Sequence, residues 1–469
     1  MLIRHSMVYV VARLLAGVFS IATTALLTRI LDPSQYGTYG LALVIGTLAF
    51  NVCFVWLGLA FKRFGQAPRD RAKTISTIVG LFGAAVILTG ALALALVLVS
   101  DALSPYMLPF LVGIALAWAL AWFELTATFE IITFQPLRNL SMNVGRAILV
   151  FIFAGAAAWI TRDPIATTLA TALGMIGGSL IGRFPLKEVK WQYFDRAFAA
   201  SILLFGLPFT VSMTMEALLW GGPRIMVQAL DSSAALGHYT AAYLLVTNTL
   251  TVLGAGISSA GYSLAVRAAE SGDAPTMRRQ LLSNGELLFA VTAPAALGLA
   301  LTADGLATTV VGPQFGEIAP LIPWMAFGAF VAALRANFLD HAFQLSRKSH
   351  LQIWVSALGA AIAIGLSIYL IPRTGALGAA MAVAVACTFS FFLALFLGKR
   401  VFSLPLPLGS VLRVVACCAF MAILVRAVPG GTPILFATQI LVGVLGYSIA
   451  ALTLNLLHLR TSVLALLAR

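Results

Sequence analysis

Apolar segments long enough to cross a lipid bilayer recur along the whole chain, and they constrain the fold more than any other feature. A transmembrane helix needs about 20 predominantly apolar residues. The chain is 61% hydrophobic and only 10% charged, whereas soluble domains are about 45–50% apolar and about 25% charged. One globular core cannot bury that excess. We therefore predict an all-α integral membrane protein whose loops are too short to form a catalytic domain.

The pattern predicts fourteen transmembrane helices, separated at turn-forming pairs such as Asp32-Pro33 and Asp163-Pro164. The first apolar segment is too long for a cleaved signal peptide, whose apolar region spans about 7–15 residues, so we expect it to be retained. The predicted helices lie near residues 6–30, 37–61, 74–99, 106–132, 140–160, 165–182, 197–219, 238–264, 280–301, 320–345, 351–371, 375–397, 409–428 and 434–457.

The basic residues indicate how these helices are oriented. With strict alternation, 20 of the 29 Lys and Arg residues fall on one side of the membrane, and four lie inside helices (Arg13, Arg146, Arg335, Arg413). Five fall on the other side: Arg29, Arg162, Arg224, Arg373 and Arg426. Cytoplasmic loops carry the excess of Lys and Arg, so we expect both termini in the cytoplasm. The net charge of +13 is spread over short clusters, and we expect no nucleic-acid partner.

The sequence offers no pattern that holds a metal or a nucleotide. Cys53, Cys387, Cys417 and Cys418 lie in apolar segments without the CxxC spacing of zinc sites. There is also no GxxxxGK[ST] loop for ATP. We therefore expect no metal, no cofactor and no ATP hydrolysis by this chain.

An internal repeat divides the chain. Leu31-Asp32-Pro33-Ser34 precedes Gly37-Thr38-Tyr39, and Leu230-Asp231-Ser232-Ser233 precedes Gly237-His238-Tyr239. Both motifs open the second helix of a six-helix block, so both blocks enter the membrane in the same sense. We predict two six-helix lobes in parallel repeat, as in some secondary transporters. The lobes would span 1–190 and 191–400, with helices 13 and 14 appended in 401–469.

Four stretches resemble a known family, and they are spread over both halves of the chain. They are Leu27-Thr28-Arg29-Ile30-Leu31 with Tyr36-Gly37-Thr38-Tyr39 and Leu57-Gly58-Leu59; Phe205-Gly206-Leu207-Pro208-Phe209; Val311-Gly312-Pro313-Gln314-Phe315 with Ala319-Pro320-Leu321; and Leu370-Ile371-Pro372-Arg373-Thr374-Gly375-Ala376-Leu377-Gly378-Ala379-Ala380. On these residues the chain resembles the polysaccharide transporter (oligosaccharide flippase) family of the multidrug/oligosaccharidyl-lipid/polysaccharide exporter superfamily. The family often has an Asp-Arg pair after helix 7, where this chain reads Gly222-Pro223-Arg224.

The resemblance implies a MATE-like fold and a transport function. Such a protein would turn undecaprenyl-pyrophosphate-linked oligosaccharide from the cytoplasmic to the outer leaflet of the bacterial inner membrane by alternating access, for exopolysaccharide, O-antigen or capsule synthesis. The expected partners are the lipid-linked oligosaccharide, membrane lipids, and polysaccharide polymerase and export machinery.

Charged residues within apolar helices are the candidate site residues, because an ionisable group at the bilayer centre costs roughly 2.5–3.5 kcal/mol on insertion scales. Arg13 could bind pyrophosphate with its planar fork, or extend to the cytoplasmic interface. Arg146 lies at the depth of Glu130, which favours an ion pair over a contact with ligand. Glu124 could titrate during transport or accept a hydrogen bond from a neighbouring helix.

Helix 10 carries a polar stripe that predicts a cavity wall. Asn337, Asp340, His341 and Gln344 are spaced i, i+3, i+4 and i+7, with Arg335 on an adjacent face. The alternative is a wetted cytoplasmic helix end. We expect Arg13, Arg146, Arg335, Asn337 and Gln344 to bind the substrate headgroup, and Glu124, Asp340 and His341 to take part in ion or proton coupling.

Other functions remain possible from the sequence. A cation-coupled exporter of drugs or metabolites would come from the same superfamily. A membrane polysaccharide polymerase or ligase would share this composition but typically has a large outer loop, and the longest outward connection here is about residues 302–319. A scaffold that does not transport is less compatible with charges inside the membrane.

Overall fold

The computed structural model describes residues 2–65, 71–346, 348, 350–405, 407–458 and 460, and its regular elements there are all helices. Side chains are not described for residues 2–14 or at positions 102, 103, 208, 255, 259, 260, 262, 263, 266, 269, 270, 408 and 458. Contacts divide the chain into two compact units, Met1–Thr240 and Ala241–Arg469.

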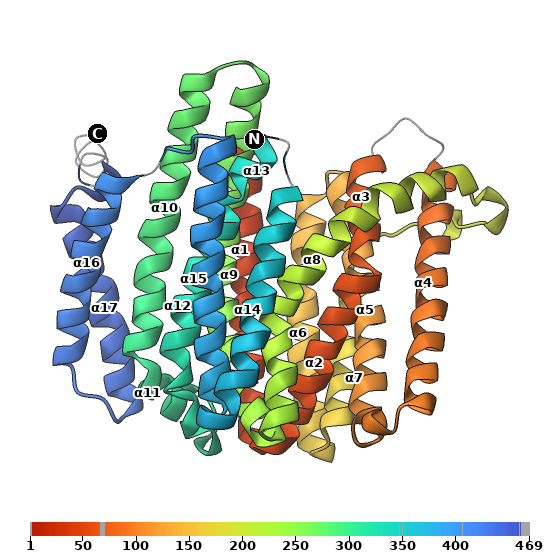
Figure 1. The fold of residues 1–469 in the computed structure, drawn as a ribbon, viewed down its shortest axis with the longest axis horizontal. Helices are drawn as coiled ribbons and strands as arrows, with labels where there is room; N and C mark the ends of the chain where they lie inside the picture. The colour runs from red at the N-terminus through yellow and green to blue at the C-terminus, as the bar shows by residue number, and fades with distance from the viewer. Residues whose placement is uncertain are drawn as a thin grey trace. The chain divides into compact units, whose positions relative to one another are not determined.

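The first unit is a bundle of long helices (Figure 1). Its spanning helix α8 bends by 41° between Arg196–Leu207 and Phe209–Leu230, at a proline, the residue that most often kinks helices. The elements are α1 (Leu2–Ile30), α2 (Pro33–Cys53), α3 (Val55–Phe64), α4 (Arg71–Val99), η1 (Asp101–Tyr106), α5 (Met107–Ile132), α6 (Pro136–Thr161), α7 (Pro164–Leu180), η2 (Leu186–Glu188), η3 (Trp191–Tyr193), α8 (Arg196–Leu230) and the start of α9 (Ser233–Glu270).

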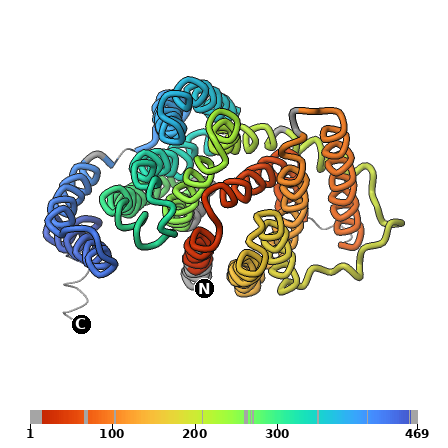
Figure 2. The backbone as a smooth tube through the Cα atoms, turned by 90° about the horizontal axis from the view of Figure 1, so that it is seen from below, coloured from red at the N-terminus to blue at the C-terminus, as the bar shows by residue number. Residues whose placement is uncertain are grey.

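The second unit contains the remainder of α9 and the C-terminal helices. Helices α16 and α17 pack on each other, and α16 also packs on α10 (Figure 2). The elements are α10 (Ala274–Leu301), α11 (Ala303–Gly305), η4 (Leu306–Val310), η5 (Pro313–Ile318), α12 (Leu321–Leu334), η6 (Arg335–Leu339), α13 (His341–Leu345), α14 (His350–Thr374), α15 (Ala376–Val401), α16 (Leu408–Ala427), α17 (Pro433–Thr453) and η7 (Leu456–His458).

The apolar helices confirm a multi-pass membrane protein. Among the described residues, 11 helices are long and apolar enough to cross a bilayer, or 12 with the bent α8. Each predicted segment contains a helix. Two of these helices, Leu15–Ile30 in α1 and Pro164–Leu180 (α7), are apolar but shorter than the 18 residues needed to count as a span. The count of fourteen spans is therefore not confirmed. On α4 the side chains of Ile87 and Leu98 are 74% and 76% exposed, which suits contact with lipid.

Helix starts follow the local sequence. Asp32 caps α2 by accepting from the backbone N–H of Gln35, and the side-chain oxygen of Gln35 accepts from the backbone N–H of Asp32. Asp163 caps α7 by accepting from Ile165 and Ala166. Each acid satisfies N–H groups that have no partner within the first helical turn. The predicted breaks at both Asp-Pro pairs are therefore real helix starts.

The two repeat motifs touch within the first unit. A Cβ added to Gly37 would overlap the carbonyl oxygen of Ser233, and one added to Gly237 would overlap the carbonyl oxygen of Pro33. The helices α2 and α9 thus cross with their backbones in contact, which only glycine permits. The equivalence of the two contacts gives the predicted repeat a local structural counterpart.

Arg224 is placed differently from the sequence-based prediction. Helix 7 was expected to end near 219, with Arg224 outside it, but α8 continues to Leu230. The Arg224 side chain is 5% exposed and donates to the carbonyl oxygen of Gly40 at 3.1 Å. The apolar pattern ended the predicted helix too early, because it treated Arg224 as a residue outside the membrane helix. A buried arginine can stay within a helix when it bonds to the backbone of a neighbouring helix.

Candidate functional site

The second span of the first unit is broken at Phe54, between α2 and α3. Phe54 has φ −131° and ψ −23°, outside the helical range. The indole N–H of Trp56 donates to the carbonyl oxygen of Cys53 at 2.8 Å, so a side chain satisfies a carbonyl that the break exposes. A side chain inserted in this way is one recognised cause of an interrupted helix. Broken helices in transporters line cavities.

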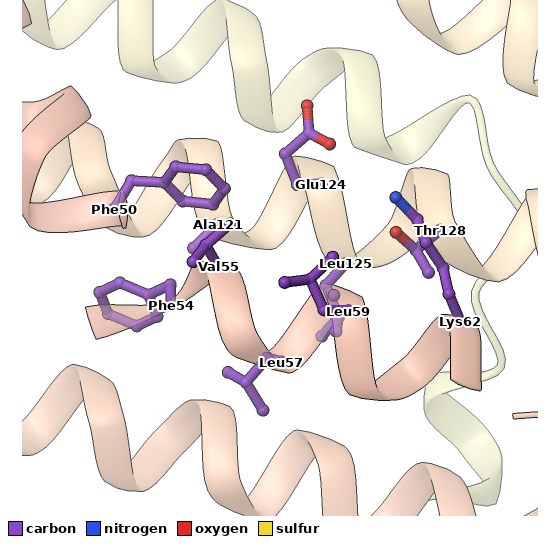
Figure 3. A pocket seen from close by; sticks show the side chains of 11 residues that line it. Phe50, Phe54, Val55, Leu57, Leu59, Lys62, Ala121, Glu124, Leu125 and Thr128 are labelled. Atoms are coloured by element: carbon purple, nitrogen blue, oxygen red, sulfur yellow. The ribbon is translucent and has the colours of Figure 1, made fainter. Parts of the chain in front are cut away.

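A pocket of about 60 Å³ lies beside this break, between α2, α3 and α5. In Figure 3 the rings of Phe50 and Phe54 lie at one end, Lys62 and Thr128 lie at the other, and Glu124 lies between them. A buried water needs roughly 10–15 Å³ of such volume. The pocket therefore has room for a few waters or a small polar group, with aromatic rings at one end, Lys62 and Thr128 at the other and Glu124 between them.

Glu124 and Arg146 belong to one charged site. Arg146 on α6 and Glu124 on α5 carry opposite charges close enough to attract each other, but they form no direct ion pair among the described residues. The Arg146 guanidinium also lies 4.4 Å from the centre of the Phe123 ring, a cation–π contact. A Cβ on Gly178 would approach the Arg146 Cβ to 2.6 Å, so a glycine of α7 makes room for the arginine. The sequence analysis proposed Glu124 and Arg146 as separate site residues and did not predict that their charges lie close together.

The predicted Arg146–Glu130 ion pair is wrong. Glu130 is fully buried and accepts from Arg138 Nη1 at 3.4 Å and from the backbone N–H of Arg183 at 2.7 Å. Arg138 is eight residues from Glu130 in the chain, and the tight turn that joins α5 to α6 brings the two side chains into contact. Arg138 therefore takes the place beside Glu130 that the prediction gave to Arg146. Glu130 therefore stabilises a helix end, and Arg146 is left to interact with Glu124.

The second unit contains a buried polar cluster. It lies where the helix predicted near residues 320–345, the tenth of the chain, loses regular α-helical geometry. Residues Arg335–Leu339 form a π-helical turn, η6, a feature often found at functional sites. Arg335 Nη1 donates to Ser356 Oγ at 3.4 Å, and Gln352 Nε2 donates to Asp340 Oδ2 at 3.1 Å. Ser258 Oγ and His341 Nε2 are 3.4 Å apart. Helices α9, η6, α13 and α14 contribute these residues, with Asp340 at the junction of η6 and α13.

The π-helical turn changes the predicted polar stripe. Asp340 and His341 are buried, Asn337 is half-buried and donates to the Ala333 carbonyl oxygen, and Gln344 is exposed. The expected spacing assumed 3.6 residues per turn, and the wider turn rotates the residues that come after it. Arg335 was expected on an adjacent face and is instead only 2% exposed, inside the cluster.

Sequence reasoning missed two polar residues of these sites and one other buried polar residue. Lys62 lines the pocket of the first unit, and Gln352 bonds to Asp340. Asn284 is 4% exposed, and neither of its amide atoms has a hydrogen-bond partner among the described residues. A polar residue in an apolar helix was the only available signal, and it was applied to charged residues first. The side chain of Arg13 lies outside the described residues.

The second unit also contains an apolar pocket of about 290 Å³. Phe289 and Leu297 of α10, Phe327 of α12, and Val414 and Cys418 of α16 are among its lining residues. One helix of the predicted appended pair, α16, thus contributes a wall to an apolar cavity. In the described part of the chain, no group of three His, Cys, Asp or Glu side chains is placed to hold a metal ion.

Comparisons with known proteins bear on the family and the fold of the chain. The family described as "Polysaccharide biosynthesis protein" matches residues 2–262, and no curated protein matches the chain. The fold is similar to the lipid II flippase MurJ, with TM-score 0.79 and 13% identity over 96% of this chain and 99% of that one.

Two further structures share the fold. An inward-facing multidrug resistance MATE family transporter of the MOP superfamily has TM-score 0.63 and 13% identity over 84% of this chain and 97% of that one. A MOP superfamily transporter from Pyrococcus furiosus has TM-score 0.52 and 14% identity over 85% and 94%. The expected MATE-like fold is confirmed.

Proposed function

Because the chain belongs to the polysaccharide biosynthesis protein family, we propose that it is a flippase for undecaprenyl-pyrophosphate-linked oligosaccharide. It would act in the bacterial inner membrane by alternating access, with both termini in the cytoplasm, and supply polysaccharide polymerase and export machinery. The observation that carries this proposal is the pair of opposite charges, Arg146 and Glu124, beside a pocket in the first unit that Glu124 and Lys62 help to line. Charges among apolar helices are costly and are usually retained for a substrate or ion.

In this proposal Arg146 binds the substrate headgroup. An arginine presents two parallel N–H donors that fit a phosphate and replace part of its hydration. Glu124 attracts Arg146 without a direct ion pair when no substrate is bound, and the pyrophosphate would attract Arg146 more strongly because it carries more negative charge. Arg13, Arg335, Asn337 and Gln344 are the further headgroup residues that we propose, and Glu124, Asp340 and His341 are the proposed coupling residues.

Flipping of a lipid-linked oligosaccharide in proteoliposomes tests the proposal. Losing a charge-assisted hydrogen bond costs roughly 1.5–3 kcal/mol, which is about 10- to 150-fold in affinity. We expect Arg146→Ala and Arg13→Ala to lose most activity. Their lysine variants should lose less, because the charge remains but the planar fork is gone. Arg413→Ala is the matched control, since Arg413 is exposed on α16.

Thermal stability of each variant separates folding from function. Normal flipping by folded Arg13→Ala and Arg146→Ala proteins would remove both residues from the site. If an imposed cation gradient instead drives the wild-type protein to transport amphipathic drugs, and the lipid-linked saccharide is not flipped, the exporter alternative replaces this proposal. That alternative has the MATE family fold in its favour.

A further inference from the structure

The loop that joins α7 to α8 presents basic and aromatic side chains at the end of two membrane helices. Trp191 is 75% exposed and Leu186 is 54% exposed. Four basic residues of the same loop are also exposed: Arg183, Lys187, Lys190 and Arg196. We name residues 183–196 the basic ledge. Because α7 and α8 are apolar helices that enter the bilayer, their connection lies at a membrane surface.

Side chains of α4 hold the ledge in a fixed position. The backbone N–H of Lys190 donates to Ser76 Oγ, and that of Asp195 donates to Thr77 Oγ1, both at 3.0 Å. Ser76 and Thr77 are themselves buried. The Phe194 ring packs where Gly80 of α4 has no side chain. The exposure of Trp191 is therefore a property of an anchored loop, which does not turn inward to bury its indole.

The acidic groups nearby are used within the protein. Glu188 forms an ion pair with Arg71 at 3.2 Å. Asp195 caps α8 by accepting from the backbone N–H of Phe198 at 3.0 Å. Glu130 accepts from the backbone N–H of Arg183. The outward face of the ledge is therefore cationic, with two large apolar side chains among the charges.

We propose that the basic ledge binds the headgroups of anionic phospholipids in the leaflet that it faces, while Trp191 and Leu186 enter the lipid interface. Tryptophan is enriched at membrane–water interfaces, and Lys and Arg mark the cytoplasmic side. Anionic lipids of the cytoplasmic leaflet attract basic segments close to the surface. The ledge would fix the first unit at a defined depth in that leaflet. This inference does not depend on which substrate the protein moves.

Lipid titration of the full chain tests the ledge. The purified protein in neutral detergent receives phosphatidylglycerol or phosphatidylcholine whose acyl chains carry bromine, which quenches nearby indoles. Since the chain has eight tryptophans, the signal of Trp191 is the difference between wild type and Trp191→Phe. We expect phosphatidylglycerol to quench Trp191 at lower concentration than phosphatidylcholine, and added salt to reduce that preference.

Charge variants then assign the binding to the ledge. The effect of one cation near an anionic surface corresponds to about a fivefold change in affinity, so Lys187→Gln with Lys190→Gln should weaken phosphatidylglycerol binding about 25-fold. Arg373→Gln with Arg426→Gln removes two exposed arginines of the second unit and should leave the affinity unchanged. Thermal unfolding without added lipid shows that both double variants fold.

Four outcomes would overturn the proposal. The first is equal quenching of Trp191 by the two lipids. The second is unchanged phosphatidylglycerol affinity in the folded Lys187→Gln, Lys190→Gln protein. The third is complete competition by millimolar inorganic phosphate, which would indicate a site for a small anion. Capture of a soluble acidic protein by the ledge, with no lipid preference, would also replace the lipid as its partner.

Discussion

Gly37 and Gly237 lie at equivalent positions of one helix crossing, each against the backbone of the helix that carries the other. The carbonyl that faces Gly37 belongs to Ser233, and the carbonyl that faces Gly237 belongs to Pro33, so each glycine contacts the first residue of the opposite helix. The two motifs that repeat in the sequence are therefore the two surfaces of this contact. Their glycines follow from the contact, because any Cβ would meet backbone that cannot rotate away.

Substitution at either glycine should destabilise the fold. Gly37→Ala and Gly237→Ala each place a methyl group against a carbonyl oxygen, and overpacking of this kind typically costs about 1–3 kcal/mol. We expect the two variants to lose similar stability because the contact is equivalent on both sides. Thermal unfolding in detergent measures the loss. Gly83→Ala is the control, since a Cβ on Gly83 of α4 meets nothing within 4 Å.

The Gly83→Ala control should be neutral or slightly stabilising, since alanine favours a helix over glycine by up to about 1 kcal/mol. If Gly37→Ala is as stable as Gly83→Ala, the close crossing of α2 and α9 is not present in solution. A large difference between Gly37→Ala and Gly237→Ala would contradict the equivalence of the two contacts.

A double-mutant cycle should detect coupling between Glu130 and Arg138. These side chains are in contact, and contacting charged pairs show interaction energies of about 0.5–3 kcal/mol. Arg138 is partly exposed, so we expect the lower part of this range. The same cycle between Glu130 and Arg146 should give a value near zero. Unfolding of each single and double alanine variant measures both energies, and coupling confined to Glu130 and Arg146 would restore the pairing expected from sequence.

Arg224 should contribute to stability through the backbone of α2. Removing a charged hydrogen-bond donor costs roughly 1.5–3 kcal/mol, and Arg224→Ala would leave the buried Gly40 carbonyl without this donor. Arg224→Met keeps more of the volume and should cost less, because an apolar group can replace a buried charge. Arg29→Ala removes an exposed arginine of the same unit and should stay within about 0.5 kcal/mol of wild type. Equal stability of Arg224→Ala and Arg29→Ala would contradict the buried contact.

The sequence predicts the helices well because the signal for each is local. A run of apolar residues between Asp-Pro turns needs no knowledge of distant contacts, and Asp32 and Asp163 mark helix starts by bonding to residues two or three positions away. Helix interiors are harder to predict. The break at Phe54 was not predicted, because the residues around it form an unbroken apolar run. The indole of Trp56 donates to the Cys53 carbonyl oxygen at the break, and an apolar pattern carries no signal for that bond.

The candidate site was predicted as a set of residues, and the one ion pair expected among them, Arg146 with Glu130, is wrong. Expected depth in the membrane selected Glu124, Arg146, Arg335 and Asp340 as costly groups, and their role in a site stays a prediction. It could not tell that Arg138 would contact Glu130, because that depends on the tight turn between α5 and α6. The polar stripe of helix 10 assumed regular geometry, and the π-helical turn at Arg335–Leu339 rotates the residues beyond it. Pairing and rotation are tertiary properties, which periodicity does not contain.

If Asp340 takes part in coupling, its charge should matter to transport more than to folding. Asp340 is fully buried and accepts from Gln352, so Asp340→Asn keeps the shape and a hydrogen-bonding group while removing the charge. We expect flipping by this variant to lose its response to an imposed proton or sodium gradient. Gln352→Ala removes the neutral partner, and we expect it to lower stability by about 1 kcal/mol and keep the response to the gradient. The measurement is flipping in proteoliposomes with and without each gradient, with thermal unfolding of both variants. A full gradient response by folded Asp340→Asn protein would exclude this carboxylate from coupling and leave it a structural partner of α14.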